Sequence, residues 1–309
     1  MDARVKGAEV AAGFELGAWC AERLARVERA LDQWLPADAP AGLGEAMRYA
    51  VLDGGKRLRP LLVMAASEAV RGHEEAALRA GCAVELIHAY SLVHDDMPCM
   101  DNDVLRRGKP TVHVRFGQAT ALLAGDALQA LAFEFLTPEP DDAGGVPQAA
   151  QARLCALLAR AAGHAGMAGG QAIDLAAVGR TLTEDELRRM HRLKTGALLQ
   201  ASVMMGVACG NATPDAAAAL ADYGRAVGLA FQVVDDILDV TADSATLGKT
   251  PGKDAAQDKP TYISLLGLER ARGYARELLE QARGALVASG LEDTRALRGL
   301  AELVVDREH

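Results

Sequence analysis

Two groups of aspartates, far apart in the chain, have residue types and spacings that could bind a metal ion. Each group ends an apolar run with the periodicity of a buried helix. The carboxylates are Asp95, Asp96 and Asp101 in the first aspartate group, and Asp235, Asp236 and Asp239 in the second aspartate group. Such closely spaced carboxylates repel one another unless a cation lies between them, and Mg²⁺ takes carboxylate oxygens while keeping substrate phosphates as further ligands. We therefore predict a magnesium-dependent site for a phosphorylated substrate.

Asp101 fits such a site only if the chain bends after Asp95. Six residues of helical rotation would carry Asp101 about 120° away from Asp95. Pro98 lies between them and cannot sit inside an unbroken helix, because its ring removes a hydrogen bond and clashes with the preceding turn. We therefore predict that the helix breaks at Pro98 and that Asp101 turns back toward the metal.

Basic residues near the first aspartate group are of the type that binds phosphate. Arg106 and Arg107 follow the group closely, and two glycines upstream precede Lys56 and Arg59 at the start of a predicted helix. Backbone amides and cations at a helix N-terminus favour a phosphate group. Two other interpretations stay open: a turn with solvated basic residues, and a surface salt-bridge patch in which each exposed pair contributes only about 0–1 kcal/mol.

Further polar residues lie close to the aspartates along the predicted helices. His88 precedes Asp95 by seven residues, which brings both onto nearly one helix face, and Gln232 lies one turn before the second aspartate group. Lys194 and Thr195 precede a glycine among small apolar residues. A lone histidine on an apolar face is more often a core residue, and Lys194 can equally be a solvated turn residue, so both alternatives stay open.

Composition favours packed helices and argues against a nucleic-acid partner. Of the 309 residues, 50% are apolar but only 4% are aromatic, and the net charge is −9. Nucleic acids need clustered Lys and Arg, whereas here the basic residues are scattered or lie beside the aspartates. No apolar stretch is long enough to span a bilayer, and glutamates interrupt any signal-peptide core, so we expect no membrane insertion. Five cysteines without a CxxC motif indicate reduced thiols in a cytoplasmic protein.

Periodicity and capping signals predict a chain of helices. Thr183 and Glu186 form a capping box that starts one helix, and Thr213 followed by Pro214 starts another. The helices that we expect cover residues 8–35, 44–52, 74–97, 117–136, 148–168 and 213–239, with two final helices that end at residue 306. The loops that we expect include residues 137–145 and 247–259.

Together these motifs resemble those of the short-chain trans-prenyltransferases, the polyprenyl synthetase family, and most closely its bacterial farnesyl diphosphate synthase subgroup. The motifs are Gly54-Gly55-Lys56-Arg57-Leu58-Arg59-Pro60, the run from His88 to Asp101, Arg106-Arg107-Gly108, Lys194-Thr195, the run from Phe231 to Asp239, and Lys249. So many motifs in this order are highly specific. The resemblance covers nearly the whole chain and implies one catalytic domain over residues 1–309.

The resemblance implies an all-α fold of the isoprenoid synthase type, a single domain of mostly antiparallel helices around a deep central cavity, and a homodimer. It also implies the reaction. Dimethylallyl or geranyl diphosphate loses its diphosphate with the help of Mg²⁺, isopentenyl diphosphate attacks the resulting allylic cation head-to-tail, and the departing diphosphate accepts the proton that is lost. The implied product is (2E,6E)-farnesyl diphosphate.

The resemblance also assigns roles to individual residues. The implied metal ligands are Asp95, Asp96, Asp101, Asp235 and Asp239, with Asp236 in support. The implied contacts to the allylic diphosphate are Arg106, Lys194 and Lys249, with Lys259 closing over it. The implied contacts to isopentenyl diphosphate are Lys56, Arg59, His88 and Arg107. The residues implied to steady the cation are Thr195 and Gln232, which with Arg106 and Lys194 form the catalytic set.

Product length is expected to depend on residues just before the first aspartate group. Tyr90 and Ser91 lie about 6–8 Å below Asp95 along a helix, on the path of a growing tail. A bulky Tyr90 resembles the aromatic floor that stops the bacterial subgroup at the C15 product, and the two extra residues Pro98 and Cys99 also match that subgroup. Geranylgeranyl and geranyl diphosphate synthases of the same family remain alternatives.

Two other classes share some of these features. His94-Asp95 is the doublet of HD-type metal phosphohydrolases, but that class leaves the second aspartate group and the two arginines unexplained. A non-catalytic partner subunit tends to lose one aspartate group, and both are present here. A terpene cyclase usually has a more aromatic cavity than this composition supplies.

Overall fold

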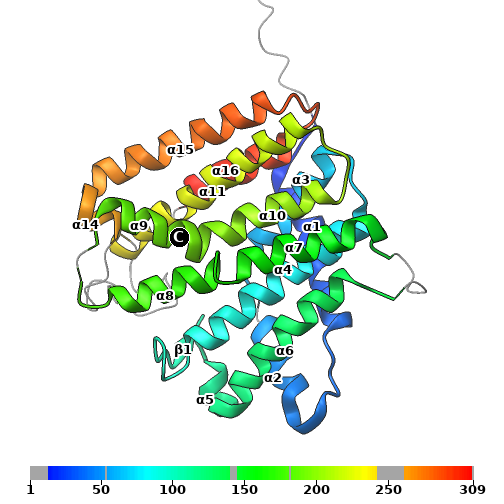
Figure 1. Ribbon diagram of the computed structural model, residues 1–309, viewed down its shortest axis with the longest axis vertical. Coiled ribbons are helices and arrows are strands. Elements are labelled where there is room, and N and C mark those ends of the chain that lie inside the picture. Colours follow the sequence, from blue (N-terminus) through cyan, green and yellow to red (C-terminus); the bar gives the residue numbers. More distant parts are fainter. Residues whose placement is uncertain (1–12, 53, 140–144, 181, 242–260, 308–309) are drawn as a thin grey trace, which may run out of the picture.

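Helices make up almost all of the regular structure. The computed structural model describes residues 13–52, 54–139, 145–180, 182–241 and 261–307 (Figure 1). The helices in the first half are α1 (Leu16–Trp34), η1 (Pro40–Gly42), α2 (Leu43–Val51), α3 (Leu58–Ala69), α4 (Glu74–Asp95), α5 (Val112–Phe116) and α6 (Gln118–Leu136). Those that follow are α7 (Gln148–Ala162), α8 (Met167–Ala177), α9 (Glu184–His191), η2 (Arg192–Gly196), α10 (Ala197–Ala208), α11 (Pro214–Thr241), α14 (Tyr262–Leu266), α15 (Leu268–Ala288) and α16 (Arg295–Val305). The all-α prediction is confirmed, since the strands in the described ranges are only β1 (Leu105–Arg106) and β2 (Lys109–Pro110).

Most predicted helices are present with boundaries shifted by a few residues. The helix predicted over residues 148–168 starts as expected, but its predicted end is wrong. It ends at Ala162, and the chain resumes at Met167 as α8. Gly163 and Gly166 form the turn between them, where the N–H of Gly166 donates to the Gly163 carbonyl at 3.0 Å. A Cβ at position 166 would overlap the last turn of α7, so two poor helix formers end the helix here.

Both predicted helix starts that lead to the site are confirmed. The Thr183 hydroxyl accepts the N–H of Glu186 at 3.3 Å, and the Glu186 carboxylate accepts the N–H of Thr183 at 2.9 Å. The Thr213 hydroxyl accepts the N–H of Ala216 at 3.2 Å. These caps start α9, which continues directly into η2, and α11, which carries the second aspartate group.

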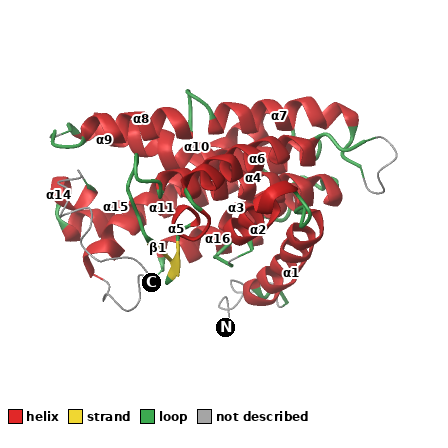
Figure 2. Cartoon of the chain, turned by 90° about the horizontal axis from the view of Figure 1, so that it is seen from below, coloured by secondary structure: helices red, strands yellow, loops and turns green. Residues whose placement is uncertain are grey.

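The central helix is α4, and its apolar residues form much of the core. Ala80, Val84 and Ile87 of α4 are fully buried, as are Leu199 and Val203 of α10. Seen along the perpendicular direction, α7, α8 and α9 form an outer layer over α4, α10 and α11 (Figure 2). The strand β1, which follows α4, and the helix α14, which packs against α11, both lie on the left-hand side of Figure 1. The two aspartate groups therefore end their helices on the same side of the molecule.

The expectation that no apolar stretch is long enough to span a bilayer is wrong by length and composition alone, since two described helices, α4 and α6, are long and apolar enough. The apolar window of α4 is 72% buried inside the protein, as expected of a core helix. That of α6 is only 39% buried, and Leu122 and Leu123 are exposed on it. Helix α6 therefore presents an apolar face at the surface.

Candidate active site

The first aspartate group lies in a tight turn that reverses the chain after α4. The N–H of Asp101 donates to the Asp95 carbonyl at 2.9 Å, and that of Asp103 donates to the Asp96 carbonyl at 3.1 Å. The helix ends at Asp95, so the predicted break near Pro98 is confirmed, slightly earlier than expected. The turn returns Asp101 to the end of α4 that bears Asp95.

Asp95 carries a negative charge in an unfavourable place. The pKa of its carboxyl is raised to about 6, chiefly by burial and also by Asp101 and Asp96, although Lys194 and Arg106 act in the opposite direction. A carboxylate that is only partly compensated by nearby cations gains from an additional one. Asp95 is therefore suited to a cation ligand role.

Asp96 has a different environment from its neighbour. It is 3% exposed, and Arg106 donates to both of its oxygens, with Nε at 2.9 Å from Oδ2 and Nη2 at 2.5 Å from Oδ1. A bidentate pair of this kind fixes the plane of the guanidinium. The pair is buried rather than part of a solvated surface patch, and Asp96 as placed orients Arg106. Its predicted role as a metal ligand stays a prediction.

The second aspartate group is divided in the same way. Asp236 is 5% exposed and accepts the side-chain amide of Gln232 at 2.8 Å and the backbone N–H of Tyr262 at 2.7 Å. Gln232 in turn accepts the hydroxyl of Thr195 at 3.0 Å. Asp236 therefore supports Gln232 and Thr195, whereas Asp235, one residue earlier, is exposed.

Asp235 contacts a residue that the sequence patterns did not indicate. Nη2 of Arg307, just after α16, lies 2.7 Å from Oδ1 of Asp235. Arg307 is far downstream of every motif and has no helical register with Asp235, so only the folded arrangement of α16 beside α11 brings them together.

A π-helical turn, η2, connects the two aspartate groups. It holds Lys194, which acts on the Asp95 carboxyl, and Thr195, which bonds to Gln232 of α11. Gly228 of α11 packs directly against this turn, since a Cβ there would lie 3.1 Å from the Gly196 Cα. Wide helical turns of this type occur often at functional sites.

Asp174 of α8 is a second site residue that the sequence interpretation missed. Its carboxylate is buried and lies 2.6 Å from the Lys194 ammonium. Gly170, one turn earlier, allows this approach, because a Cβ there would overlap the Lys194 backbone. The signal was available in the sequence, where Gly169-Gly170-Gln171 and Asp174 interrupt an apolar run. Both polar atoms of the Gln171 side-chain amide are also buried, without a hydrogen-bond partner in the described part of the chain.

The cations predicted to hold the second diphosphate are gathered on one side of the site. Arg59 and Arg107 both act on His88, whose pKa burial and these arginines depress well below its usual value, so its imidazole is neutral at pH 7. Arg107 donates to the Gly54 carbonyl, and Gly55 lies against its guanidinium. Nε of Arg59 is buried without a partner among the described residues.

The lysine of the same loop extends this cationic region toward the second aspartate group. Burial and Arg307 lower the pKa of Lys56, and Asp235 raises it. Asp235 therefore lies close enough to Lys56 for their charges to interact.

Arg57 of the same loop is not available to a ligand. It has a left-handed φ of 45°, is 4% exposed, and donates to Glu28 at 2.7 Å and to Glu85 at 2.9 Å. Arg57 is thus bound within the core, whereas its sequence neighbours Lys56 and Arg59 belong to the cationic region near His88 and Asp235.

His94 serves packing rather than metal ligation. Its Nε2 lies 3.1 Å from the Leu122 carbonyl, and its ring fills the space above Gly125, where a Cβ would overlap it. The ring also packs edge-to-face with Tyr90 at 5.7 Å between centroids. An HD-type metal site would need this histidine as a ligand, so the geometry disfavours that class.

The donor set of the two groups fits a hard divalent cation in kind, since it consists of carboxylate oxygens. Asp96 and Asp236 are buried and already bonded to protein donors. The remaining candidates for metal ligands are Asp95, Asp101, Asp235 and Asp239. Among the described residues, no three acidic, histidine or cysteine side chains already converge as a complete site. Mg²⁺ is commonly bound through one or two carboxylates, with substrate phosphates and water completing the shell.

Other predicted site residues are either consistent or untested. Tyr90 is buried directly before the first group, and the Ser91 hydroxyl donates to the His88 carbonyl at 2.8 Å. Lys249 and Lys259 lie outside the described residues, as does the loop 247–259.

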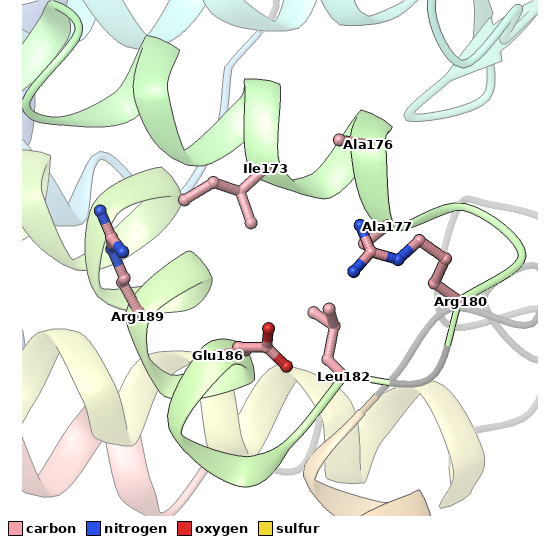
Figure 3. A pocket seen from close by; sticks show the side chains of 7 residues that line it. All are labelled: Ile173, Ala176, Ala177, Arg180, Leu182, Glu186 and Arg189. Carbon is pink, nitrogen blue, oxygen red and sulfur yellow. The ribbon is translucent and has the colours of Figure 1, made fainter.

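A pocket between α8 and α9 is lined by Ile173, Leu182, Glu186 and other residues that belong to neither aspartate group (Figure 3). It is therefore distinct from the predicted central cavity.

Comparisons with known proteins agree with these motifs. A family model described as polyprenyl synthetase matches residues 40–292. The chain is 49% identical over 270 residues to farnesyl diphosphate synthase of Escherichia coli, covering 85% of this chain and 88% of that protein. It is 43% identical over 309 residues to a chloroplastic geranylgeranyl pyrophosphate synthase of Capsicum annuum, covering 100% and 83%. A crystal structure of an FPP/GFPP synthase from Zymomonas mobilis matches with a TM-score of 0.82 and 43% identity, covering 94% and 98%.

The raised pKa of Asp95 predicts that removing its charge stabilises the protein in EDTA. A carboxyl whose pKa is higher in the folded than in the unfolded chain destabilises the fold once it ionises, progressively between about pH 4 and pH 6. Asp95→Asn should therefore raise the free energy of unfolding by about 1–3 kcal/mol at pH 7.5 and leave it nearly unchanged at pH 4. Urea unfolding followed by circular dichroism measures both values.

The matched control is Asp38→Asn, which removes an exposed aspartate of a loop and should change stability little at either pH. An Asp95→Asn gain that is equal at pH 4 and pH 7.5 would contradict the electrostatic explanation.

Proposed function

The chain belongs to the polyprenyl synthetase family, and on that premise we propose that it makes (2E,6E)-farnesyl diphosphate from isopentenyl diphosphate with dimethylallyl and geranyl diphosphate, in a Mg²⁺-dependent reaction. At the level of class, the chain is a short-chain prenyltransferase of the type of farnesyl and geranylgeranyl diphosphate synthases. The family match over residues 40–292 supports one catalytic domain for the chain.

The observation that supports the proposal is that the two adjacent aspartates of each pair, Asp95–Asp96 and Asp235–Asp236, have different environments. Asp96 and Asp236 are buried and bonded to protein donors, whereas Asp95 and Asp235 lie beside cations. One member of each pair orients a residue of the predicted catalytic set, Arg106 in the first and Gln232 in the second. The other member is placed to hold a cation. This arrangement supports ionisation of a diphosphate ester better than hydrolysis by a single metal centre.

The proposed mechanism uses the described residues for charge and position. Mg²⁺ bound by the outer aspartates would neutralise the charge that develops on the diphosphate leaving group. Arg106, oriented by Asp96, and Lys194, held by Asp174, hold the allylic diphosphate from two sides. Thr195 and Gln232 direct their dipoles at the carbon that becomes cationic. No protein base is required, because the diphosphate that departs can accept the proton.

The second substrate is proposed to bind at the group of Lys56, Arg59, His88 and Arg107. A neutral His88 donates a hydrogen bond to a diphosphate oxygen without adding charge, and the three cations neutralise the anion. Gly54 leaves space for a close approach of phosphate to the backbone, since nothing lies within 4 Å of a Cβ built on it.

The C15 product is the finer part of the proposal. Tyr90 is 9% exposed and packs on His94 one turn before Asp95, where a tail that grows away from the aspartates would meet it. The named relatives include both farnesyl and geranylgeranyl diphosphate synthases, so geranylgeranyl diphosphate is the alternative product within the same reaction.

We also propose a homodimer in the cytoplasm. The exposed apolar face of α6 would be buried by the same face of a second copy, and an isologous contact of this kind is the commonest route to dimers. All five cysteines are free, including the exposed Cys99, as expected in a reducing compartment.

The direct test of the function is incubation with isopentenyl diphosphate, geranyl diphosphate and Mg²⁺, followed by chromatography of the dephosphorylated products. We expect farnesol as the main product and no condensation in EDTA. If no product longer than the allylic substrate forms, the enzyme proposal fails. If the main product is C20, the class stands and the C15 assignment is wrong.

Replacing the proposed floor residue should lengthen the product. Tyr90→Ala removes a buried ring from the C-terminal part of α4, just before Asp95. The tail of the product can then extend past position 90. We expect C20 and longer products in place of most of the C15 product, measured by the same chromatography. Tyr49→Ala, which removes a half-buried ring from α2, is the control and should keep the wild-type product length. An unchanged C15 product from Tyr90→Ala would show that another residue stops the chain.

The dimer proposal predicts that a charge on the α6 face separates the subunits. Leu123→Glu places a carboxylate at a 56% exposed position on that face, and burying it in an interface would be unfavourable. Light scattering after size-exclusion chromatography should give the dimer mass for the wild-type protein and the monomer mass for the variant. Leu303→Glu on α16, at a position 49% exposed, should remain dimeric. A monomeric wild-type protein, or a dimeric Leu123→Glu variant, would contradict this interface.

A further inference from the structure

Arg307 is held beside the second aspartate group by hydrogen bonds from Nη2 and by stacking of its guanidinium on an aromatic ring. Nη2 lies 2.7 Å from Oδ1 of Asp235 and 3.3 Å from the Phe231 carbonyl. The guanidinium carbon lies 4.2 Å from the centre of the Phe231 ring, and the side chain is only 9% exposed. A guanidinium that is stacked, hydrogen-bonded and largely buried keeps its charge at a fixed position.

This fixed charge balances an arrangement that would otherwise be strained. Asp235 and Asp239 lie one turn apart on α11, where like charges disfavour the helix. Arg307 is the last described residue, just after α16. It supplies a positive charge to Asp235 from within the protein. The protein therefore compensates part of this group by itself.

The influence of Arg307 extends to the predicted isopentenyl diphosphate side. Arg307 and burial both lower the pKa of Lys56, which means that the two cations are close enough to repel one another. Asp235 acts on Lys56 and also on Arg59 in the opposite sense. Arg307 thus lies between the second aspartate group and the cations of the neighbouring substrate site.

A fixed cation next to a ligand carboxylate has opposite effects on the two species that must bind. It disfavours a divalent cation at Asp235, because two positive charges then lie within a few ångströms of each other in a partly buried site. It favours an anionic diphosphate at the same place. Once a diphosphate is bound, its negative charge offsets the repulsion between Arg307 and the metal ion.

We propose that Arg307 sets the order of binding, by opposing a divalent cation at Asp235 until a diphosphate enters the site. This inference rests on the proposed function, since it takes Asp235 as a metal ligand. It assigns a role to a residue outside the aspartate and lysine motifs. The consequence is that the protein without substrate binds metal weakly at the second aspartate group, which keeps the carboxylates from collecting cations unproductively.

The test is a titration with Mn²⁺, in which electron paramagnetic resonance measures the free ion. It is carried out on the full chain without substrate and again with saturating inorganic pyrophosphate. Without pyrophosphate, Arg307→Gln should bind Mn²⁺ about tenfold more tightly than the wild-type protein, the size expected for loss of one nearby fixed charge. With pyrophosphate, the difference should shrink to about twofold or less. Arg307→Lys keeps the charge and should resemble the wild-type protein.

The control is Arg298→Gln, which makes the same charge change at an exposed position on α16 and should leave Mn²⁺ affinity unchanged. Thermal unfolding in EDTA checks that Arg307→Gln is folded, and Arg307→Lys provides the comparison if it is not. If Arg307→Gln binds Mn²⁺ as weakly as the wild-type protein or more weakly, Arg307 orients Asp235 instead of opposing the metal, and the proposal fails.

The same titration separates this proposal from the proposed function. Failure of the wild-type protein to bind Mn²⁺ even with pyrophosphate would overturn both, because Asp235 would then hold no metal. Pyrophosphate-dependent Mn²⁺ binding that is identical in all variants would overturn only the role of Arg307.

Discussion

The site depends on one constraint: several carboxylates must lie close together without a ruinous electrostatic cost. The protein meets it by treating adjacent aspartates differently. Asp96 and Asp236 are buried, where protein donors satisfy them, and each orients a neighbouring polar side chain. Asp95 and Asp235 lie beside cations instead. In each pair of adjacent aspartates, one carboxylate thus orients a neighbouring side chain while the other lies beside cations.

The turn η2 makes the two halves into a single site. Lys194 reaches toward the first aspartate group while it is held by Asp174 of α8, and Thr195 joins the hydrogen-bond chain of the second group. Small residues make this possible, because Gly170 and Gly228 let α8 and α11 approach the backbone of the turn. A side chain at either position would displace the turn and so change both halves together. The position of Lys194 is therefore set by helix packing, while its charge is set by the sequence.

The basic residues show how strongly burial divides like side chains. Arg57 and Arg59 are two residues apart, yet Arg57 is bound by Glu28 and Glu85 in the core and Arg59 lies on the side of His88. A left-handed backbone at Arg57 turns the chain between them. Burial of Arg57 is tolerable because the Glu28 and Glu85 carboxylates and the Val51 carbonyl satisfy its donors. Arg106 is held in the same way, because its donors form hydrogen bonds with both carboxylate oxygens of Asp96.

Much of the chemistry could be predicted from the sequence, because it depends on residue type and local spacing. Helix periodicity placed most elements, the proline predicted the return of Asp101, and the paired aspartates with nearby arginines indicated a metal-assisted diphosphate site. Local spacing could not reveal Arg307 at Asp235 or Asp174 at Lys194, since these pairs are separated by 72 and 20 residues and meet only when helices pack. It also could not distinguish Asp95 from Asp96, which are identical in type and adjacent. The sequence by itself determined which charges the site contains. The tertiary structure decided which of them are buried against protein donors and which stay more exposed, because burial and contact arise only from packing.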